Sequence, residues 1–291
     1  MRVYGCIGSL AGKCYCLMKT RPWSIYFIYI WLIVFSLLPF GLILFASFLT
    51  KDPKHLVSLP FTLENYYNLL SPVFGKVFLR SALMAAVTTF FCLLLAYPFS
   101  YLLVKSKHQS ALLILIIIPF WTSSLVRTYA LMAILKFKGI LNTILLKLHL
   151  ISEPLTLLYT NFAVLSGLVY NLFPFMVLPI FTNMERFDFR LIEAAKDLGA
   201  NKWSIFFRVF LPNTAPGIIS GCLLVMLPAM TLFYIPNILG GARSILLGNM
   251  IQSQFLVLEN WPQGAATSTV LTALLLLLLL FYRRHSREMI H

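Results

Sequence analysis

Apolar residues in this chain form long runs that short polar segments separate. A helix needs about 20 apolar residues to cross the roughly 30 Å hydrocarbon core of a bilayer. Six runs meet that length, at 25–48, 79–104, 111–135, 161–182, 213–235 and 264–282. Because lipid offers no hydrogen-bond partners, each run must satisfy its backbone within one helix. The pattern therefore predicts an all-α polytopic membrane protein with six transmembrane helices.

The six runs define one membrane domain with short ends. We expect an N-terminal extension over residues 1–22, a six-helix transmembrane domain over 23–284 and a tail over 285–291. Prolines fall inside the second to fifth runs. Such prolines break backbone hydrogen bonds that lipid cannot replace, so segments that carry them usually face protein or a cavity. Each one can also be a simple kink, but four kinked spans together favour a translocation bundle.

Composition and charge support this class and set its orientation. The 291 residues are 60% hydrophobic and 11% charged, whereas a soluble domain carries roughly a quarter charged residues. The net charge of +14 raises the possibility of nucleic-acid binding. We reject it because Lys and Arg occur in short blocks beside the apolar runs. Fourteen of them lie on the side of the termini and eight on the other. This excess predicts cytoplasmic termini and a cytoplasmic 183–212 segment.

The 183–212 segment is too polar to enter a bilayer. It holds four of the nine acidic residues, Glu185, Asp188, Glu193 and Asp197. Asp188 is expected to cap a helix over 189–198, and Gly199 stands where a glycine ends a helix. Asn201 is expected to cap a second short helix over 202–210, which Pro212 stops. The pattern predicts two short helices joined by a glycine turn.

Several apolar side chains of this segment are expected to be exposed and to seek a groove on another protein. They are Phe189, Ile192, Leu198, Ile205 and Phe206. A surface helical hairpin without any partner would explain the same local pattern.

The order of residues in this segment resembles a known motif. Glu193-Ala194-Ala195 is followed three residues later by Gly199 and then by Val209-x-Leu211-Pro212. This resembles the Glu-Ala-Ala (EAA) loop of the membrane subunits of bacterial ABC importers, with Val209 in place of an isoleucine. The resemblance implies that the loop over 185–212 is a coupling loop that docks on a cytoplasmic ATPase subunit. The coupling residues would be Glu193, Ala194, Ala195, Gly199, Leu211 and Pro212.

A wider resemblance covers nearly everything from residue 23 to residue 282. The runs 119–129, 221–230 and 264–268 resemble those of the spermidine/putrescine importer permeases. The family implies a type I ABC importer permease fold and a heterodimer with a second permease subunit. It also implies two cytoplasmic ATPase subunits, an external polyamine-binding protein and a place in the bacterial inner membrane. We expect no cofactor. The EAA loop is shared widely, so a permease for iron, thiamine or sulfate is the alternative.

Polyamines are cations, yet no acidic residue lies deep in any span. A candidate substrate path would therefore depend on aromatic rings that attract ammonium groups, about 0.5–2 kcal/mol each, and on amide oxygens. The candidates are Phe120, Trp121, Arg127, Tyr129, Tyr234 and Asn237, with Tyr170 and Phe233 beside them. Arg127 must face protein or water and is a structural or a gating residue. Most aromatic residues in such a chain only pack or face lipid.

Other functions find little support in the sequence. An intramembrane enzyme would need a Gly-x-Ser-x-Gly or His-Glu-x-x-His motif or paired acids inside spans, and the chain has none. The five cysteines and five histidines show no metal-ligand spacing. We expect a transport subunit without catalytic chemistry of its own.

Overall fold

The computed structural model describes residues 22–51, 58–241 and 244–288. The regular secondary structure of the described chain is helical, apart from an isolated bridge between Thr50 and Ser58. The expected N-terminal extension lies outside these residues, except for its last one, as does the end of the expected tail. Nothing in the described chain contradicts the expected domain limits, which stay a prediction.

Five helical segments are long and apolar enough to cross a membrane, within the part of the chain that the structure describes. They are Ile25–Ala46, Pro72–Lys105, Ser124–Lys147, Asn161–Glu185 and Lys202–Thr231. Four of them correspond to α1 (Pro22–Ala46), α3 (Pro72–Lys105), α7 (Asn161–Glu185) and α10 (Leu211–Thr231) with the turns before it. A further helix, α12 (Trp261–Glu288), covers the expected sixth run.

The expected third span is not one helix, and this expectation was wrong. The run divides into α4 (Gln109–Ile117), the 3-10 turn η1 (Ile118–Trp121) and α5 (Ser124–Leu135). Thr122 and Ser123 between them have extended backbone angles. Pro119 has no N–H to donate to the preceding turn, which ends α4 there. After α5 the chain continues into α6 (Ile140–Lys147).

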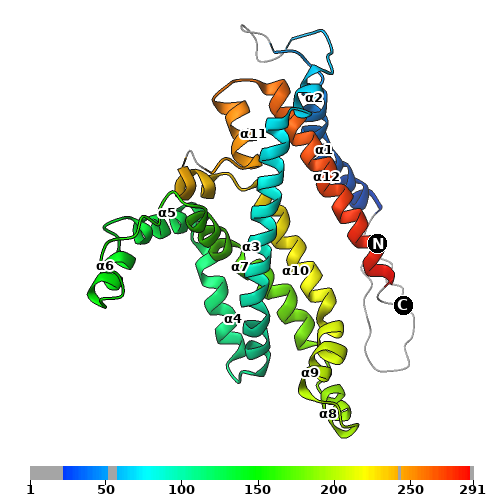
Figure 1. Ribbon diagram of the computed structural model, residues 1–291. Helices are drawn as coiled ribbons and strands as arrows, with labels where there is room; N and C mark the ends of the chain where they lie inside the picture. The colour runs from blue at the N-terminus through cyan, green and yellow to red at the C-terminus, as the bar shows by residue number, and fades with distance from the viewer. Residues whose placement is uncertain (1–21, 52–57, 242–243, 289–291) are drawn as a thin grey trace, which may run out of the picture.

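The centre of the molecule consists of α3, α7 and α10, which lie side by side (Figure 1). Helix α7 contributes the most buried face, which includes Leu168, Met176 and Ile180 at 0% exposure. Small residues on α10 let the two backbones approach closely. A Cβ on Gly217 would lie 2.6 Å from the Cβ of Asn183 on α7. The three helices form the packed core from which the other elements extend.

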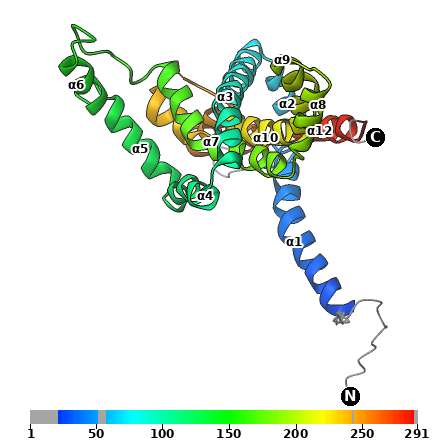
Figure 2. The same ribbon diagram turned by 90° about the horizontal axis from the view of Figure 1, so that it is seen from below.

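The remaining elements surround this core unevenly. Helices α1 and α12 contact each other on one side (Figure 1), and α1 extends away from the rest when seen from below (Figure 2). The short helices α2 (Glu64–Leu69) and α11 (Leu247–Leu256) lie near one end of α3. At the other end lie α8 (Arg190–Asp197) and α9 (Lys202–Ile205). The polar segment between α7 and α10 is thus placed at one end of the central bundle.

Candidate functional site

The polar segment folds as two short helices around a glycine turn. Gly199 has a φ of 78°, a left-handed conformation that glycine adopts without the steric penalty of a side chain. Its N–H donates to the Lys196 carbonyl at 2.9 Å, and the Ala200 N–H donates to the Ala195 carbonyl at 3.0 Å. This pair of bonds is the Schellman arrangement that closes a helix C-terminus. The predicted glycine ending of the first helix is confirmed.

The helix starts are fixed by side chains. Asn201 accepts a hydrogen bond from the Ser204 N–H at 2.7 Å, so the predicted cap of the second helix is confirmed. Helix α8 begins at Arg190, one residue later than expected for a cap at Asp188. The Asp188 carboxylate still accepts from the Arg190 N–H at 3.0 Å. Both turns are therefore determined by local sequence chemistry.

Pro212 does not stop the second helix, and that expectation was wrong. After α9 the chain widens into a π-helical turn, η2 (Phe206–Phe210), and runs directly into α10, where Pro212 lies in the first turn. The N–H of Leu211 reaches the Phe206 carbonyl. Proline cannot donate to the preceding turn but fits the start of a helix, and a π-turn absorbs the irregularity. The loop is thus joined rigidly to a central helix.

An aromatic cluster connects the loop to the central bundle. Phe210 is 4% exposed, and the centroid of its ring lies 5.2 Å from that of Phe187 and 5.5 Å from that of Tyr101 on α3. Tyr97 on α3 packs edge-on against Phe206 with ring centroids 6.0 Å apart. Edge-to-face pairs of this kind contribute beyond their buried area, about 0.5–1.5 kcal/mol each. Loop, α3 and α10 therefore meet in one packed contact.

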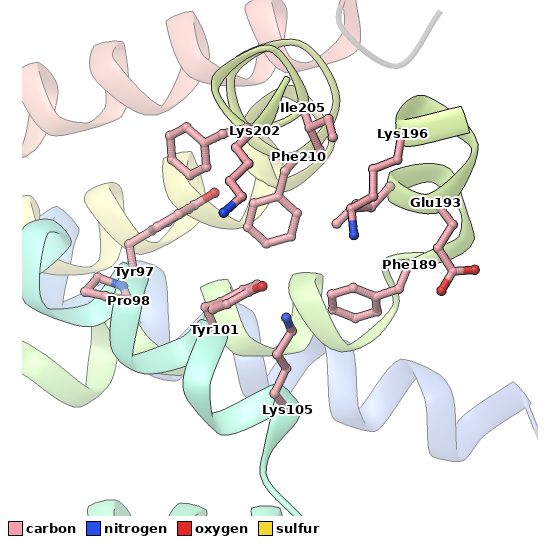
Figure 3. Close-up of a pocket in the computed structure, with 12 residues that line it drawn as sticks. Tyr97, Pro98, Tyr101, Lys105, Phe189, Glu193, Lys196, Lys202, Ile205 and Phe210 are labelled. Carbon is pink, nitrogen blue, oxygen red and sulfur yellow. The ribbon is translucent and has the colours of Figure 1, made fainter. Parts of the chain in front are cut away.

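A cavity of about 830 Å³ opens beside this cluster (Figure 3). Its aromatic and apolar part comes from α3 and from the loop, and its charged rim holds Lys105, Lys196, Lys202 and Glu193. In Figure 3 the three lysine side chains extend toward the space between the rings, and the Glu193 carboxylate lies at the outer edge. Lys105 lies over the Tyr101 ring, 4.4 Å from its centroid.

The six predicted coupling residues lie along one continuous segment with different exposures. Glu193, Ala194, Gly199 and Pro212 are exposed, and Ala195 and Leu211 are half-buried. The expectation of exposed apolar side chains was partly wrong. Ile205 is buried, and Phe189, Ile192 and Phe206 are half-buried against the bundle, whereas Leu198 is 89% exposed.

A different set of apolar side chains faces outward from the loop. Leu191, Leu198, Trp203 and Phe207 are each more than 45% exposed. Trp203 and Phe207 stack with centroids 6.1 Å apart. Because α8 and α9 are too short to be stable alone, the inward side chains hold them to the bundle. The outward set is the apolar face of the loop that the described chain leaves exposed.

The candidate substrate residues divide into two groups. Arg127 on α5 lies over the Phe120 ring, 4.8 Å from its centroid, and 6.0 Å from that of Tyr170 on α7. Phe120 also packs edge-on against Phe175 at 5.3 Å. Trp121 is 84% exposed and Tyr129 58%. The structure thus brings Phe120, Arg127 and Tyr170 together and leaves Trp121 and Tyr129 outside this contact.

The second group surrounds Asn237 in the π-turn η3 (Pro236–Gly240). The Asn237 side-chain N–H donates to the side-chain oxygen Oε1 of Gln252 at 2.7 Å. Asn249 donates to Asn237 Oδ1 and, at 3.1 Å, to the Phe233 carbonyl. Tyr234 is half-buried beside Phe233. Among the described residues, no ring contact or hydrogen bond joins this group to the Arg127 group.

Several residues of these sites were not predicted from the sequence. Asn249 is 8% exposed, and its side-chain oxygen has no partner among the described residues. Asn171 on α7 donates to the Gly167 carbonyl at 2.9 Å, and its oxygen is likewise unpartnered in the described chain. Buried polar groups inside membrane helices mark functional positions, so a search of the spans for Asn and Gln would have found Asn171. Asn249 lies on α11, outside the six expected spans, and such a search would have missed it. No comparable feature of the sequence marked Phe210 or Tyr97.

A family match over nearly the whole chain defines the class of protein, the membrane subunit of a transport system that works with a binding protein. Residues 5–290 match the family described as "Binding-protein-dependent transport system inner membrane component". The chain therefore belongs to that family, as a transport subunit without catalytic chemistry and a multi-pass protein of the bacterial inner membrane.

Particular relatives are similar over nearly the whole chain. The spermidine/putrescine transport system permease protein PotB of Haemophilus influenzae is 48% identical over 271 residues, covering 92% of this chain and 95% of that protein. PotB of Escherichia coli K12 is 50% identical over 259 residues, covering 88% and 94%. A solved bacterial alginate ABC transporter, in complex with an alginate pentasaccharide-bound periplasmic protein, has a similar fold. Its TM-score is 0.74 at 15% identity, covering 92% of this chain and 95% of that one.

Proposed function

We propose that this chain is the permease subunit of an ABC importer that carries spermidine and putrescine across the inner membrane. The observation that supports this most is the 48–50% identity to the two PotB permeases across about nine-tenths of the chain. A second permease, two ATPase subunits and an external polyamine-binding protein complete the importer.

The loop around α8 and α9 is the part that receives mechanical work. We propose that its outward face, with Leu198 and Trp203, docks on the ATPase in the cytoplasm. Glu193 and Ala194, also exposed on α8, lie within that contact, and Gly199 sets the angle between the two helices. Both termini are then cytoplasmic, and α12 is the sixth span.

In this proposal, few elements transmit the motion of the loop to the membrane helices. Movement of the loop passes through Phe210 to α3 and, by the unbroken helix of η2 and α10, into the core. Rigid helices that shift together switch a cavity between two openings. The break at Thr122–Ser123 gives α4 and α5 independent directions, which suits a span that lines the moving cavity.

The cargo is proposed to pass near the amide group around Asn237. Amide and backbone carbonyl oxygens accept hydrogen bonds from ammonium groups, and the Tyr234 and Phe233 rings add cation–π attraction. Arg127 is better placed to stabilise the packing of α5 than to bind cargo, because its guanidinium already lies over the Phe120 ring. Trp121 and Tyr129 remain candidates for the substrate path only because their side chains are exposed.

Uptake measurements test the cargo. The chain is expressed with its second permease, ATPase and binding protein in a host that lacks polyamine uptake, and radiolabelled spermidine is followed. We expect saturable uptake that unlabelled putrescine inhibits and that ferric iron, thiamine and sulfate leave unchanged. Uptake of one of those three cargoes in place of spermidine would support the alternative importer and contradict the proposal.

A further inference from the structure

The geometry of the cavity beside the loop points to a binding site for the phosphate of an anionic phospholipid of the inner leaflet. Three lysines, Lys105, Lys196 and Lys202, line this cavity against a single acid, Glu193. Among the described residues, neither the Lys196 nor the Lys202 ammonium group has an ion-pair or hydrogen-bond partner. Unpaired cations that converge on one space attract an anion, and phosphate oxygens accept several ammonium donors at once.

The depth of the cavity favours a lipid. Helix α3 has 34 residues, which corresponds to roughly 50 Å of helix. That length exceeds the hydrocarbon core of about 30 Å and spans the headgroup layers as well. Lys105 is its last residue, so its ammonium group lies at the level of the headgroups. Lys196 and Lys202 reach the same level from the loop.

The shape of the cavity matches a molecule with a charged head and apolar chains. Tyr97, Tyr101 and Phe210 form its inner wall, and the lysines form its rim (Figure 3). Tyrosines at the membrane interface pack against acyl chains and glycerol. Basic pockets between helices on the cytoplasmic side bind anionic headgroups. A small free anion would use the rim and leave the aromatic wall unused.

The consequence is a lipid that links α3 to both loop helices. Its phosphate would neutralise the repulsion between Lys105, Lys196 and Lys202, which belong to three separate elements. The loop would then be held to the bundle in the position that meets the ATPase. This inference rests on the proposed cytoplasmic placement of the loop.

Native mass spectrometry of the full-length chain, purified with its partners, tests the site. Dioleoyl phosphatidylglycerol is titrated against dioleoyl phosphatidylcholine on the wild type and on a Lys105→Gln, Lys196→Gln, Lys202→Gln variant. We expect the wild type to prefer phosphatidylglycerol and each lost lysine to weaken this binding about five-fold. A variant with arginine at the three positions should retain it, which separates charge from folding.

A matched control carries the same change of charge outside the cavity, as Lys107→Gln, Lys138→Gln and Lys147→Gln. Equal loss of lipid in both triple variants would overturn the inference, because charge alone would then explain binding. Displacement of the lipid by millimolar inorganic phosphate would assign the site to a free anion instead. Unchanged lipid binding with loss of the co-purifying ATPase would make the cavity a protein contact. Because binding is read without transport, the result is independent of which cargo is imported.

Discussion

The phenolic oxygen of Tyr97 on α3 lies 3.1 Å from the hydroxyl oxygen of Thr214 on α10. The Thr214 hydroxyl also donates to the carbonyl of Phe210 at 2.9 Å. A polar bond and an aromatic contact therefore meet at the point where the loop joins the core. Thr214 is buried, and the bond links the two helices at the loop end of the bundle.

Removal of the Phe210 ring tests this junction. Phe210→Ala is expected to destabilise the protein by about 3–5 kcal/mol, because the ring is almost fully buried and the cavity would stay unfilled. Uptake should fall along with the melting temperature in detergent. Phe90→Ala is the control, since Phe90 on α3 is 60% exposed and should change little. Equal effects of the two substitutions would contradict the role of Phe210.

Gly199→Ala tests the turn between α8 and α9. A Cβ at Gly199 meets nothing within 4 Å, so the expected cost of about 1–2 kcal/mol comes from the left-handed backbone alone. We expect weaker co-purification of the ATPase and lower uptake. Gly75→Ala, which also meets nothing within 4 Å but lies within helix α3, should have no effect. Wild-type behaviour of the Gly199 variant would show that the turn is not needed.

Gly217→Ala tests the close approach of α10 to α7. The added Cβ would lie 2.6 Å from the Asn183 Cβ and 3.0 Å from the Pro179 carbonyl oxygen. Overpacking of this kind costs about 1–3 kcal/mol, and the melting temperature should fall accordingly. Gly41→Ala on α1 meets nothing within 4 Å and is the matched control. No difference between the two variants would argue against a tightly packed core.

Arg127→Gln separates a bracing role from a cargo role. Loss of the guanidinium over Phe120 and Tyr170 is expected to destabilise the fold by about 0.5–2 kcal/mol, with spermidine KM unchanged. Lys138→Gln, an exposed cation outside any ring contact in the described chain, serves as control. A raised KM at unchanged stability would place Arg127 in the path instead.

Local chemistry explains what the sequence could predict. Gly199 and Asn201 act on their own backbone within three residues, so their turns followed from residue type alone. Long apolar runs likewise predicted α1, α3, α7 and α10, because the length and hydropathy of a run do not depend on which other helices pack against it.

Tertiary contacts explain what the sequence could not predict. The break at Thr122–Ser123 lies inside an apolar run. Two small polar residues change the average hydropathy of such a run very little, so the break was not predicted. The ring contacts of Phe210 with Tyr97 and Tyr101 depend on α3, which is about a hundred residues away in the chain. Pro212 stops a helix in some contexts and starts one in others, and here packing against the core selected the start.

The placement of Leu198 offers the most direct test of the coupling proposal. A single-cysteine variant, Leu198→Cys, is made after the five native cysteines are replaced. Inverted and right-side-out membrane vesicles, with and without the ATPase subunit, are then treated with a membrane-impermeant maleimide. We expect labelling in inverted vesicles only, and protection when the ATPase is present, because Leu198 projects from the loop. Labelling of right-side-out vesicles, or labelling that the ATPase does not change, would contradict the proposal that this loop receives the work of ATP hydrolysis.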